Sequence, residues 1–172
     1  LMEMATIDSL TGLLNRHAGA EQLYRLVAQA QASVRPLSLI LADIDHFKAI
    51  NDVHGHKAGD DALVCVGRVL KSCVRAGDRA IRWGGEEFVL MLYDSNAASA
   101  LGLLERVRAK VQAMELPFDG RSVRVTVSMG VALSRPGEPL ERLLERADVA
   151  LYEAKSQGRN RVVLALPETA VG

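Results

Sequence analysis

Two acidic positions stand where a carboxylate is unfavourable unless something compensates it. Asp43 ends the apolar run from Leu39 to Ala42, which has the length of a buried strand. A carboxylate that emerges from such a strand is costly without a cationic partner. Glu86 and Glu87 follow directly after Gly84-Gly85. On a strand these two side chains point to opposite faces, so only one of them can share a pocket with Asp43.

If Asp43 and Glu86 meet, the pair predicts a site for a divalent cation. Two carboxylates about 4 Å apart repel each other by about 4 kcal/mol at an effective dielectric near 20, and a divalent cation reverses that sign. Ligands that are all oxygen favour Mg²⁺ or Mn²⁺, and Mg²⁺ is commonly held by one or two carboxylates plus substrate phosphates. Asp45 would project to the same side as Asp43 if the strand continued. Taken singly, each feature also fits a structural role, as an acidic turn or a strand end.

Helical and strand periods alternate along the chain and predict the elements that must position these acids. Asp60 is expected to cap one helix, and Asp94 or Ser95 the next. Gly84-Gly85 suits a tight hairpin whose turn needs positive φ. The predicted helices cover 16–32 and 60–74, a stretch from Leu101 to Met114, and one from Leu140 to Ala154 that Gly158 ends; the predicted strands cover 37–43, 80–83, 87–93, 121–133 and 161–166.

Length and composition indicate one globular domain. The chain has 172 residues, 49% hydrophobic and 24% charged, which is not the composition of a disordered segment. Its 21 Lys and Arg balance 21 Asp and Glu, which argues against a nucleic-acid partner, since such domains are usually strongly basic. We expect a single α+β domain over residues 1–172, with 1–7 as the remnant of an upstream linker and 167–172 as a C-terminal tail.

The cysteines and the hydropathy pattern predict a cytoplasmic domain. Cys65 and Cys73 lie eight residues apart in one predicted helix, roughly 12 Å, beyond the roughly 7 Å that a disulfide allows. We therefore expect reduced thiols. The longest candidate apolar run, Leu37 to Ala42, has six residues, far short of the ~18 of a membrane span. No signal peptide is present, and an anchor upstream in the full-length protein stays an open alternative.

The motifs, taken in order, resemble the GGDEF-domain diguanylate cyclases. The pentapeptide Gly84-Gly85-Glu86-Glu87-Phe88 is similar to the GGEEF variant of the family signature. The resemblance covers essentially the whole chain, and its other motifs are 8–16, 43–48, Asn51-Asp52, Gly55-His56, Gly59-Asp60, Lys155 and 158–161. It implies a fold like nucleotidyl cyclases and polymerase palms, ferredoxin-like, with a mainly antiparallel five-stranded sheet flanked by helices. It also implies condensation of two GTP into cyclic di-GMP and two pyrophosphates.

The resemblance implies roles for individual residues in catalysis. Asp43, the main-chain carbonyl of Ile44 and Glu86 would hold Mg²⁺ or Mn²⁺, two ions per active site. Glu86 would also help to take the proton from the attacking 3′-hydroxyl. Lys48 would stabilise charge on the transferred phosphoryl group, a role for which a preorganised cation is suited.

Substrate contacts follow from the same resemblance. Asn51 and Asp60 match the guanine-binding pair. A carboxylate can accept from N1 and N2 of guanine together, whereas adenine would leave Asp60 unpaired, at a cost that favours GTP over ATP. Lys155 and Arg159 match the terminal-phosphate contacts, although a solvated basic helix end is the alternative. The full set of substrate-binding positions is Phe47, Lys48, Asn51, His56, Asp60, Lys155 and Arg159.

Arg75 and Asp78 match the RxxD inhibitory site of the family, with Asp78 six residues before Gly84. An arginine fork can bind phosphate and guanine edges bidentately. Arg106 is expected to supply the second arginine, with Arg108 as the competing candidate. The alternative is a solvated helix end with no ligand.

The expected partners are GTP, cyclic di-GMP and a second copy of the chain, because each subunit presents one GTP and the two must meet antiparallel. The resemblance also implies an upstream sensory or receiver domain that this chain lacks. His46, His54 and His56 fit no structural zinc pattern, and 55–59 lacks the ending of a Walker A motif. A non-catalytic sensor of cyclic di-GMP or GTP on the same scaffold is the competing hypothesis. Synthesis of another cyclic dinucleotide is disfavoured by Asp60.

Overall fold

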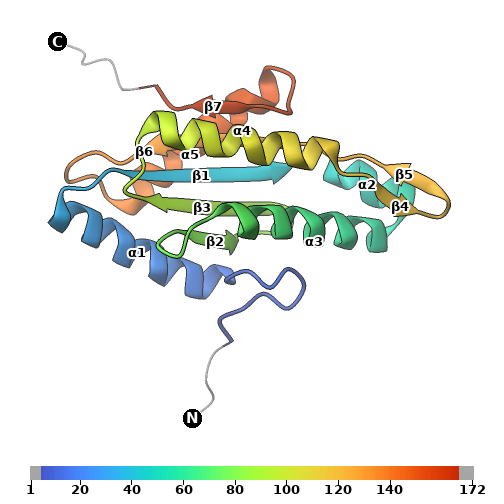
Figure 1. The fold of residues 1–172 in the computed structure, drawn as a ribbon, viewed down its shortest axis with the longest axis horizontal. Coiled ribbons are helices and arrows are strands. Elements are labelled where there is room, and N and C mark those ends of the chain that lie inside the picture. The colour runs from blue at the N-terminus through green and yellow to red at the C-terminus, as the bar shows by residue number, and fades with distance from the viewer. Residues whose placement is uncertain (1–4, 167–172) are drawn as a thin grey trace.

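The computed structural model describes residues 5–166, and a single five-stranded sheet organises them (Figure 1). The strand order is β2-β3-β1-β6-β7. Central β1 (Leu37–Ile44) is antiparallel to β3 (Glu87–Tyr93) and to β6 (Val127–Leu133). At the edges, β2 (Arg79–Arg82) is antiparallel to β3, and β7 (Val162–Leu164) is parallel to β6. The predicted α+β class and mainly antiparallel sheet are confirmed.

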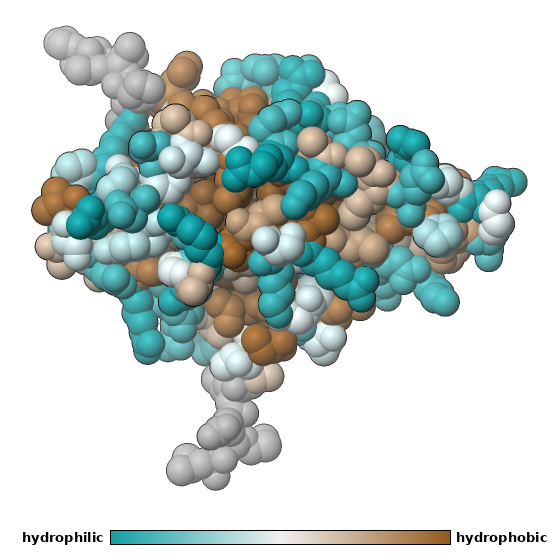
Figure 2. All heavy atoms as spheres, in the orientation of Figure 1, coloured by the Kyte–Doolittle hydropathy of each residue, from teal (hydrophilic) through white to brown (hydrophobic). Residues whose placement is uncertain are grey.

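Helices cover both faces of this sheet (Figure 1). α1 (Arg16–Ser33) and α5 (Leu140–Ser156) pack on one face. α3 (His56–Cys73) and α4 (Ala97–Ala113) pack on the other. The short α2 (Phe47–His54) follows β1 directly and packs against α3. On the face carrying α3 and α4, exposed hydrophobic residues are interrupted by hydrophilic ones (Figure 2), as on most globular surfaces.

The alternation of β1 decides where its last acid lies. Leu37, Leu39 and Leu41 belong to the core under α1 and α5, whereas Ile40 and Ala42 belong to the core under α3 and α4. The strand is apolar at both parities because both of its faces are covered. By the same period of two, Asp43 faces the α1 and α5 side at the end of the strand.

The start of α3 differs from the prediction. The helix begins at His56, and Gly55 with φ 90° is its N-cap, so Asp60 lies inside the helix and caps nothing. Sequence reasoning missed α2, and therefore placed the helix start at the first long apolar period. Gly55 makes the sharp break between the two helices possible, because glycine adopts positive φ without a steric penalty.

The predicted cap of α4 was also wrong. Asn96, not Asp94 or Ser95, is the N-cap, and its Oδ1 accepts from Ser99 N at 2.9 Å. Ser95 is buried, and its carbonyl oxygen accepts a hydrogen bond from the Ser38 hydroxyl of β1.

The turn between β2 and β3 is not the tight positive-φ hairpin that the two glycines predicted. Neither Gly84 nor Gly85 has positive φ. Instead, the N–H groups of Trp83 and Gly84 both donate to the carbonyl of Glu87, at 2.8 and 3.2 Å. A Cβ on Gly84 would lie 2.9 Å from Glu87 Oε2.

The segment predicted as one strand over 121–133 is divided. β5 (Arg121–Val123) pairs with β4 (Leu116–Phe118) in a separate hairpin, and β6 starts only at Val127. Asp119 and Gly120, both with positive φ, form the hairpin turn. The main sheet therefore receives only the second part of the predicted strand.

The chain ends are described only in part. Ile7 forms a β-bridge with Leu14, so residues 5–7 contact the domain. Residues 1–4 and the tail 167–172 lie outside the described residues, and the predicted linker and tail stay predictions. Cys65 and Cys73 are both free and partly buried. Within 5–166, no helix combines the length and the apolarity needed to cross a membrane.

Candidate active site

Asp43 and Lys155 form the centre of the site. The Asp43 side chain is buried, and its Oδ2 accepts from Nζ of Lys155, on the last turn of α5. Burial raises the pKa of Asp43, the Lys155 ammonium opposes that rise, and the charge of Asp45 adds to it. The packing of α5 across the sheet thus supplies the cationic partner that a carboxylate at the end of a buried strand requires.

The Glu86 carboxyl is close enough to Asp43 and Lys155 for their charges to act on it. The N–H of Ile44 donates to the carbonyl oxygen of Glu86 at 3.3 Å, which holds the end of β1 against the loop before β3. Burial raises the pKa of the Glu86 carboxyl, the charges of Asp43 and Glu87 raise it further, and Lys155 opposes them. The structure therefore brings Asp43 and Glu86 together, from segments more than forty positions apart in the sequence.

The donor atoms at this site fit a hard divalent cation. Asp43 Oδ1 is buried and has no hydrogen-bond partner among the described residues, since Lys155 contacts only Oδ2. A buried acceptor without a partner is costly, and carboxylate oxygen is the ligand that Mg²⁺ prefers. Within 5–166, no group of three or more His, Cys, Asp or Glu side chains could hold a metal ion. Two carboxylates completed by other oxygens is the usual magnesium arrangement.

Asp45 does not join Asp43, because β1 ends at Ile44. Its carboxylate is buried and accepts three hydrogen bonds: from Ser128 Oγ at 2.6 Å, Thr126 Oγ1 at 2.7 Å and Asn160 N at 3.0 Å. Sequence reasoning missed this cluster. No local signal could have found it, since the partners lie 81, 83 and 115 positions away.

The residues matched to guanine binding lie where α2 packs on α3. The Asn51 side-chain Oδ1 is buried without a partner among the described residues. A Cβ on Gly59 would stand 1.9 Å from that oxygen and 3.2 Å from Cζ of Phe47, so only glycine leaves the space that Asn51 occupies. Asp60, the next residue of α3, is exposed.

Lys48 and His56 are exposed on the same pair of helices. Lys48 is in the first turn of α2, and His56 is the first residue of α3. Neither forms an ion pair with another residue in the described part of the chain. Both side chains are therefore accessible to a ligand.

Lys155 and Arg159 do not lie on the same helix. α5 ends at Ser156, and Arg159 lies in the following loop with φ 66°. The loop stays close to the helix, because Arg159 N donates to the carbonyl of Ala154 at 3.0 Å. Within 5–166, no acidic side chain pairs with the Arg159 guanidinium.

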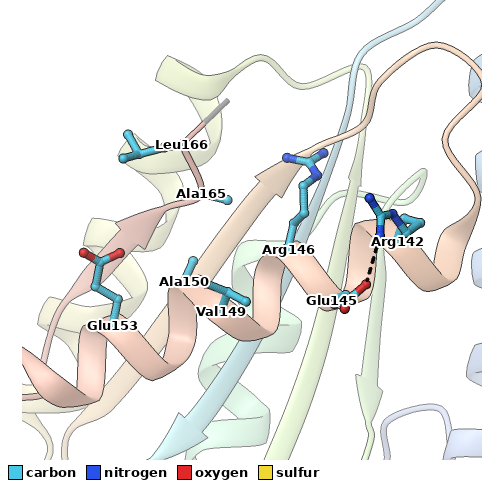
Figure 3. Close-up of a pocket in the computed structure, with 8 residues that line it drawn as sticks. All are labelled: Arg142, Glu145, Arg146, Val149, Ala150, Glu153, Ala165 and Leu166. Carbon is cyan, nitrogen blue, oxygen red and sulfur yellow. Dashed lines mark ion pairs between the residues drawn. The ribbon is translucent and has the colours of Figure 1, made fainter. Parts of the chain in front are cut away.

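The groove in Figure 3 is a different place on the molecule. It has a volume of about 370 Å³ between α5 and the chain that leaves β7, with Val149 and Leu166 among its lining residues. The Arg142–Glu145 ion pair, 3.7 Å long, lies at its edge (Figure 3). Neither Asp43 nor Glu86 lines it, so this groove is not the centre described above.

Comparison with known proteins decides the family. The family described as "Diguanylate cyclase, GGDEF domain" matches residues 5–161. The chain belongs to the GGDEF family. Diguanylate cyclase A of Treponema denticola is 42% identical over 170 residues, covering 96% of this chain and 46% of that protein. Diguanylate cyclase DgcM of Escherichia coli K12 is 46% identical over 165 residues, covering 92% of this chain and 38% of that protein. The chain thus spans less than half the length of these relatives.

A solved structure shares the fold over nearly its whole length. The GGDEF domain of DgcB from Caulobacter crescentus, solved in complex with c-di-GMP, superposes with a TM-score of 0.93 at 37% identity. The match covers 97% of this chain and 97% of that one. The architecture described above is therefore that of a GGDEF domain.

In this GGDEF domain, Asp78 organises the residues matched to the inhibitory site. Asp78 is buried, and its Oδ2 accepts from Arg75 N at 2.8 Å, while Oδ1 accepts from Tyr93 N at 3.0 Å. The guanidinium of Arg75 reaches Asp78 Oδ2 at 3.3 Å and the carbonyl of Tyr93 at 2.7 Å, with its side chain 63% exposed. Asp78 thus holds Arg75 in place, and the exposed guanidinium is the part that a ligand can reach.

The structure separates the two candidate second arginines. Arg106 lines a pocket of about 200 Å³ together with Arg75 and Asp78. Arg108 points elsewhere, with bonds to Glu105 and, at 3.0 Å, to Oδ1 of Asn160. Only Arg106 therefore shares a pocket with the RxxD pair.

Proposed function

We propose that this GGDEF domain is the catalytic part of a diguanylate cyclase. It would condense two GTP into cyclic di-GMP and release two pyrophosphates. The observation that carries the proposal is the meeting of Asp43 and Glu86, where a buried carboxylate oxygen without a partner lies beside Lys155. Similarity to proteins named diguanylate cyclases supports it.

The reaction requires one proton to leave for each bond formed. The 3′-oxygen of one GTP attacks the α-phosphorus of the other, and the bond from that phosphorus to the pyrophosphate oxygen breaks. The same exchange then occurs in the opposite sense and closes the ring. Glu86 would help to receive the 3′-hydroxyl proton, a role for which a positioned carboxylate is suited. In the metal-free chain, burial and neighbouring acids raise the pKa of its carboxyl.

Asp43, the Ile44 carbonyl and Glu86 would hold Mg²⁺ or Mn²⁺, with two ions per active site. When bound, such cations lower the pKa of an attacking oxygen and neutralise charge on a leaving pyrophosphate. Lys155 already occupies Oδ2 of Asp43, so Oδ1 is the oxygen available for the cation. The chain's own contribution is to fix these oxygens before substrate arrives, which avoids reorganisation during the reaction.

GTP would lie along α2 and α3 with its phosphates toward the end of α5. Asn51 Oδ1 and Asp60 would accept from the guanine edge, and Phe47 and His56 would line the same segment. The orphaned, buried Asn51 oxygen supports this assignment, since it lacks a donor within the described chain.

Three cations would bind the phosphates. Lys155 and Arg159 would contact the terminal phosphates, and Lys48 would stabilise charge on the transferred phosphoryl group. They come from three separate segments, α5, the loop after it and α2.

Each chain offers one such nucleotide site, and the reaction consumes two GTP. A homodimer with the two nucleotides antiparallel therefore supplies the geometry. An upstream sensory or receiver domain would control that pairing. Cyclic di-GMP would bind to Arg75 and Arg106, with Asp78 holding Arg75 in place, and inhibit further synthesis.

One assay separates this proposal from a non-catalytic sensor of GTP or cyclic di-GMP. The chain is incubated with GTP and Mg²⁺ at two enzyme concentrations, and the nucleotide products are separated and pyrophosphate is measured. A cyclase releases cyclic di-GMP and pyrophosphate in a 1:2 ratio, and its specific rate rises with enzyme concentration. A chain that binds GTP with Mg²⁺ but releases no pyrophosphate at either concentration would be a sensor.

A further inference from the structure

The loop after α5 holds three consecutive residues in the left-handed region. φ is 119° at Gly158, 66° at Arg159 and 49° at Asn160. Glycine adopts this conformation freely and asparagine tolerates it, but in Arg159 the Cβ approaches the following carbonyl oxygen. A strained residue such as Arg159 persists only where the surrounding structure holds it.

Asp45 is one of the contacts that hold this loop, together with the hydrogen bond from Arg159 N to the carbonyl of Ala154 at 3.0 Å. Asp45 Oδ2 accepts from the main-chain N–H of Asn160 at 3.0 Å, and the residue as a whole is 4% exposed. Hydrogen bonds to a buried carboxylate are stronger than neutral ones. Asp45 is itself fixed, because Thr126 and Ser128 of the β6 region donate to its two oxygens.

Arg108 of α4 supplies a second contact. Its Nη1 donates to Oδ1 of Asn160 at 3.0 Å, while the rest of the guanidinium binds Glu105. Asn160 is thus held through its main chain by Asp45 and through its side chain by Arg108. The residue before it, Arg159, carries a guanidinium that no acidic side chain within 5–166 binds.

The loop that follows α5 therefore decides where Arg159 points. A helix would set the direction of a residue four positions after Lys155, but α5 ends at Ser156. We propose that Asp45 is a positioning residue for the terminal phosphates of the nucleotide, because it keeps the Gly158–Asn160 loop in the conformation that presents Arg159 next to the last turn of α5. This inference rests on the proposed function, in which Arg159 and Lys155 bind those phosphates.

A purely structural role for Asp45 predicts something different. If the carboxylate only joins β1 to β6, its loss would lower stability and weaken every nucleotide alike. If it positions Arg159, its loss would weaken ligands that carry terminal phosphates and spare those that lack them. Affinity for GMP against affinity for a triphosphate therefore separates the two roles.

The experiment compares dissociation constants for 3′-deoxy-GTP, which cannot condense, and GMP, by calorimetry on the whole chain with Mg²⁺. We expect Asp45→Ala to weaken 3′-deoxy-GTP about tenfold and to leave GMP within about twofold. Asp45→Asn should restore most of the triphosphate affinity, because its amide oxygen can still accept from Asn160 N. Ser128→Ala is the matched control: it removes a hydrogen bond from the same carboxylate but not the link to the loop, so the ratio should stay unchanged.

A double-mutant cycle tests the route through Arg159. In an Arg159→Ala background, Asp45→Ala should add less than about twofold, because the guanidinium it positions is gone. If circular dichroism shows that Asp45→Ala does not fold, Arg108→Ala should still weaken 3′-deoxy-GTP selectively, by about threefold.

Three results would overturn the inference alone. These are an equal loss for GMP and the triphosphate, an undiminished effect in the Arg159→Ala background, or no selective effect of Arg108→Ala where the Asp45 variant is unfolded. A wild-type chain that binds neither nucleotide would instead overturn the proposed function, and the inference with it.

Discussion

Lys155 donates to Oδ2 of Asp43 and leaves Oδ1 of the same carboxylate buried without a partner within the described chain. The two residues are far apart in the sequence, since β1 lies in its first third and α5 near its end. One oxygen is neutralised by the protein and the other is ready for a ligand. Before any ligand binds, Lys155 therefore compensates the Asp43 carboxylate at one oxygen but not at the other.

Glu86→Gln should abolish turnover and yet stabilise the metal-free chain at neutral pH. The pKa of Glu86 is raised in the folded state by burial and by Asp43. For an acid with a raised pKa, the favourable contribution is present below the unfolded pKa, near 4.3, and is lost as pH rises through the folded value. Removing the charge should therefore give a gain on the order of 0.5 kcal/mol at pH 7 that disappears by about pH 4.

Urea unfolding of the wild-type chain and of Glu86→Gln, with EDTA at pH 4 and pH 7, measures the difference between their free energies of unfolding. Glu115→Gln is the control, because its carboxylate pairs with Arg124 in an exposed ion pair away from the site. A variant that retains turnover, or one that gains no stability at pH 7, would contradict the position assigned to Glu86.

Mg²⁺ should stabilise the wild-type chain against unfolding in the absence of nucleotide, and Asp43→Asn should remove that effect. A ligand that binds only the folded state at ten times its dissociation constant adds about 1.4 kcal/mol. The buried Oδ1 of Asp43 is the oxygen expected to bind it. Thermal denaturation across a Mg²⁺ titration gives the result, with Asp52→Asn as a control outside the site. An equal response of wild type and Asp43→Asn would remove Asp43 from the metal site.

Gly59→Ala should impair guanine binding although it adds only a methyl group. The new Cβ would stand 1.9 Å from Oδ1 of Asn51, so the Asn51 amide must move. We expect the KM for GTP to rise about tenfold or more, equivalent to about 1.4 kcal/mol, with the fold retained. Gly77→Ala is the matched control, since nothing lies within 4 Å of its added Cβ. An unchanged KM would show that Asn51 does not contact the base.

Arg75→Ala and Arg106→Ala should relieve product inhibition, whereas Arg108→Ala should not. Arg75 and Arg106 share one pocket, while Arg108 is engaged with Glu105 and Asn160. Loss of one bidentate guanidinium should raise the inhibition constant for cyclic di-GMP by about tenfold or more. Initial rates at increasing concentrations of cyclic di-GMP measure it. Selective relief by Arg108→Ala would reverse the assignment.

Val34→Gly should stabilise the domain. Val34 ends α1 at φ 52° and ψ 48°, in the left-handed region, and its side chain is 89% exposed. A β-branched residue in this conformation costs about 1–2 kcal/mol, which glycine avoids. We expect a gain of about 1 kcal/mol and a higher melting temperature. Val53→Gly, at an exposed position inside α2, should destabilise by about 1 kcal/mol. Equal losses for both would show that Val34 carries no strain.

The sequence alone predicted much of this protein because the relevant signals are local. The apolar run ending at Asp43 is buried from both faces, so its composition directly indicates a central strand. The signature 84–88 and the order of the other motifs indicated the family. Local signals failed where more than one residue could cap a helix. Asp60 was predicted to cap α3, but Gly55, between α2 and α3, is its N-cap.

Only the tertiary structure decided which acids and cations act together. Asp43 and Asp45 are chemically alike and two residues apart, yet one meets Lys155 and the other the N–H of Asn160. In the same way, Arg106 was the expected second arginine and Arg108 the competing candidate, and the packing of α4 separates them. The physical reason is that a strand end or a helix face sets the direction of each side chain, and the partner it meets comes from a distant segment that packing brings there. Composition and spacing indicate the direction of a side chain on its strand or helix, but not the distant partner that it meets.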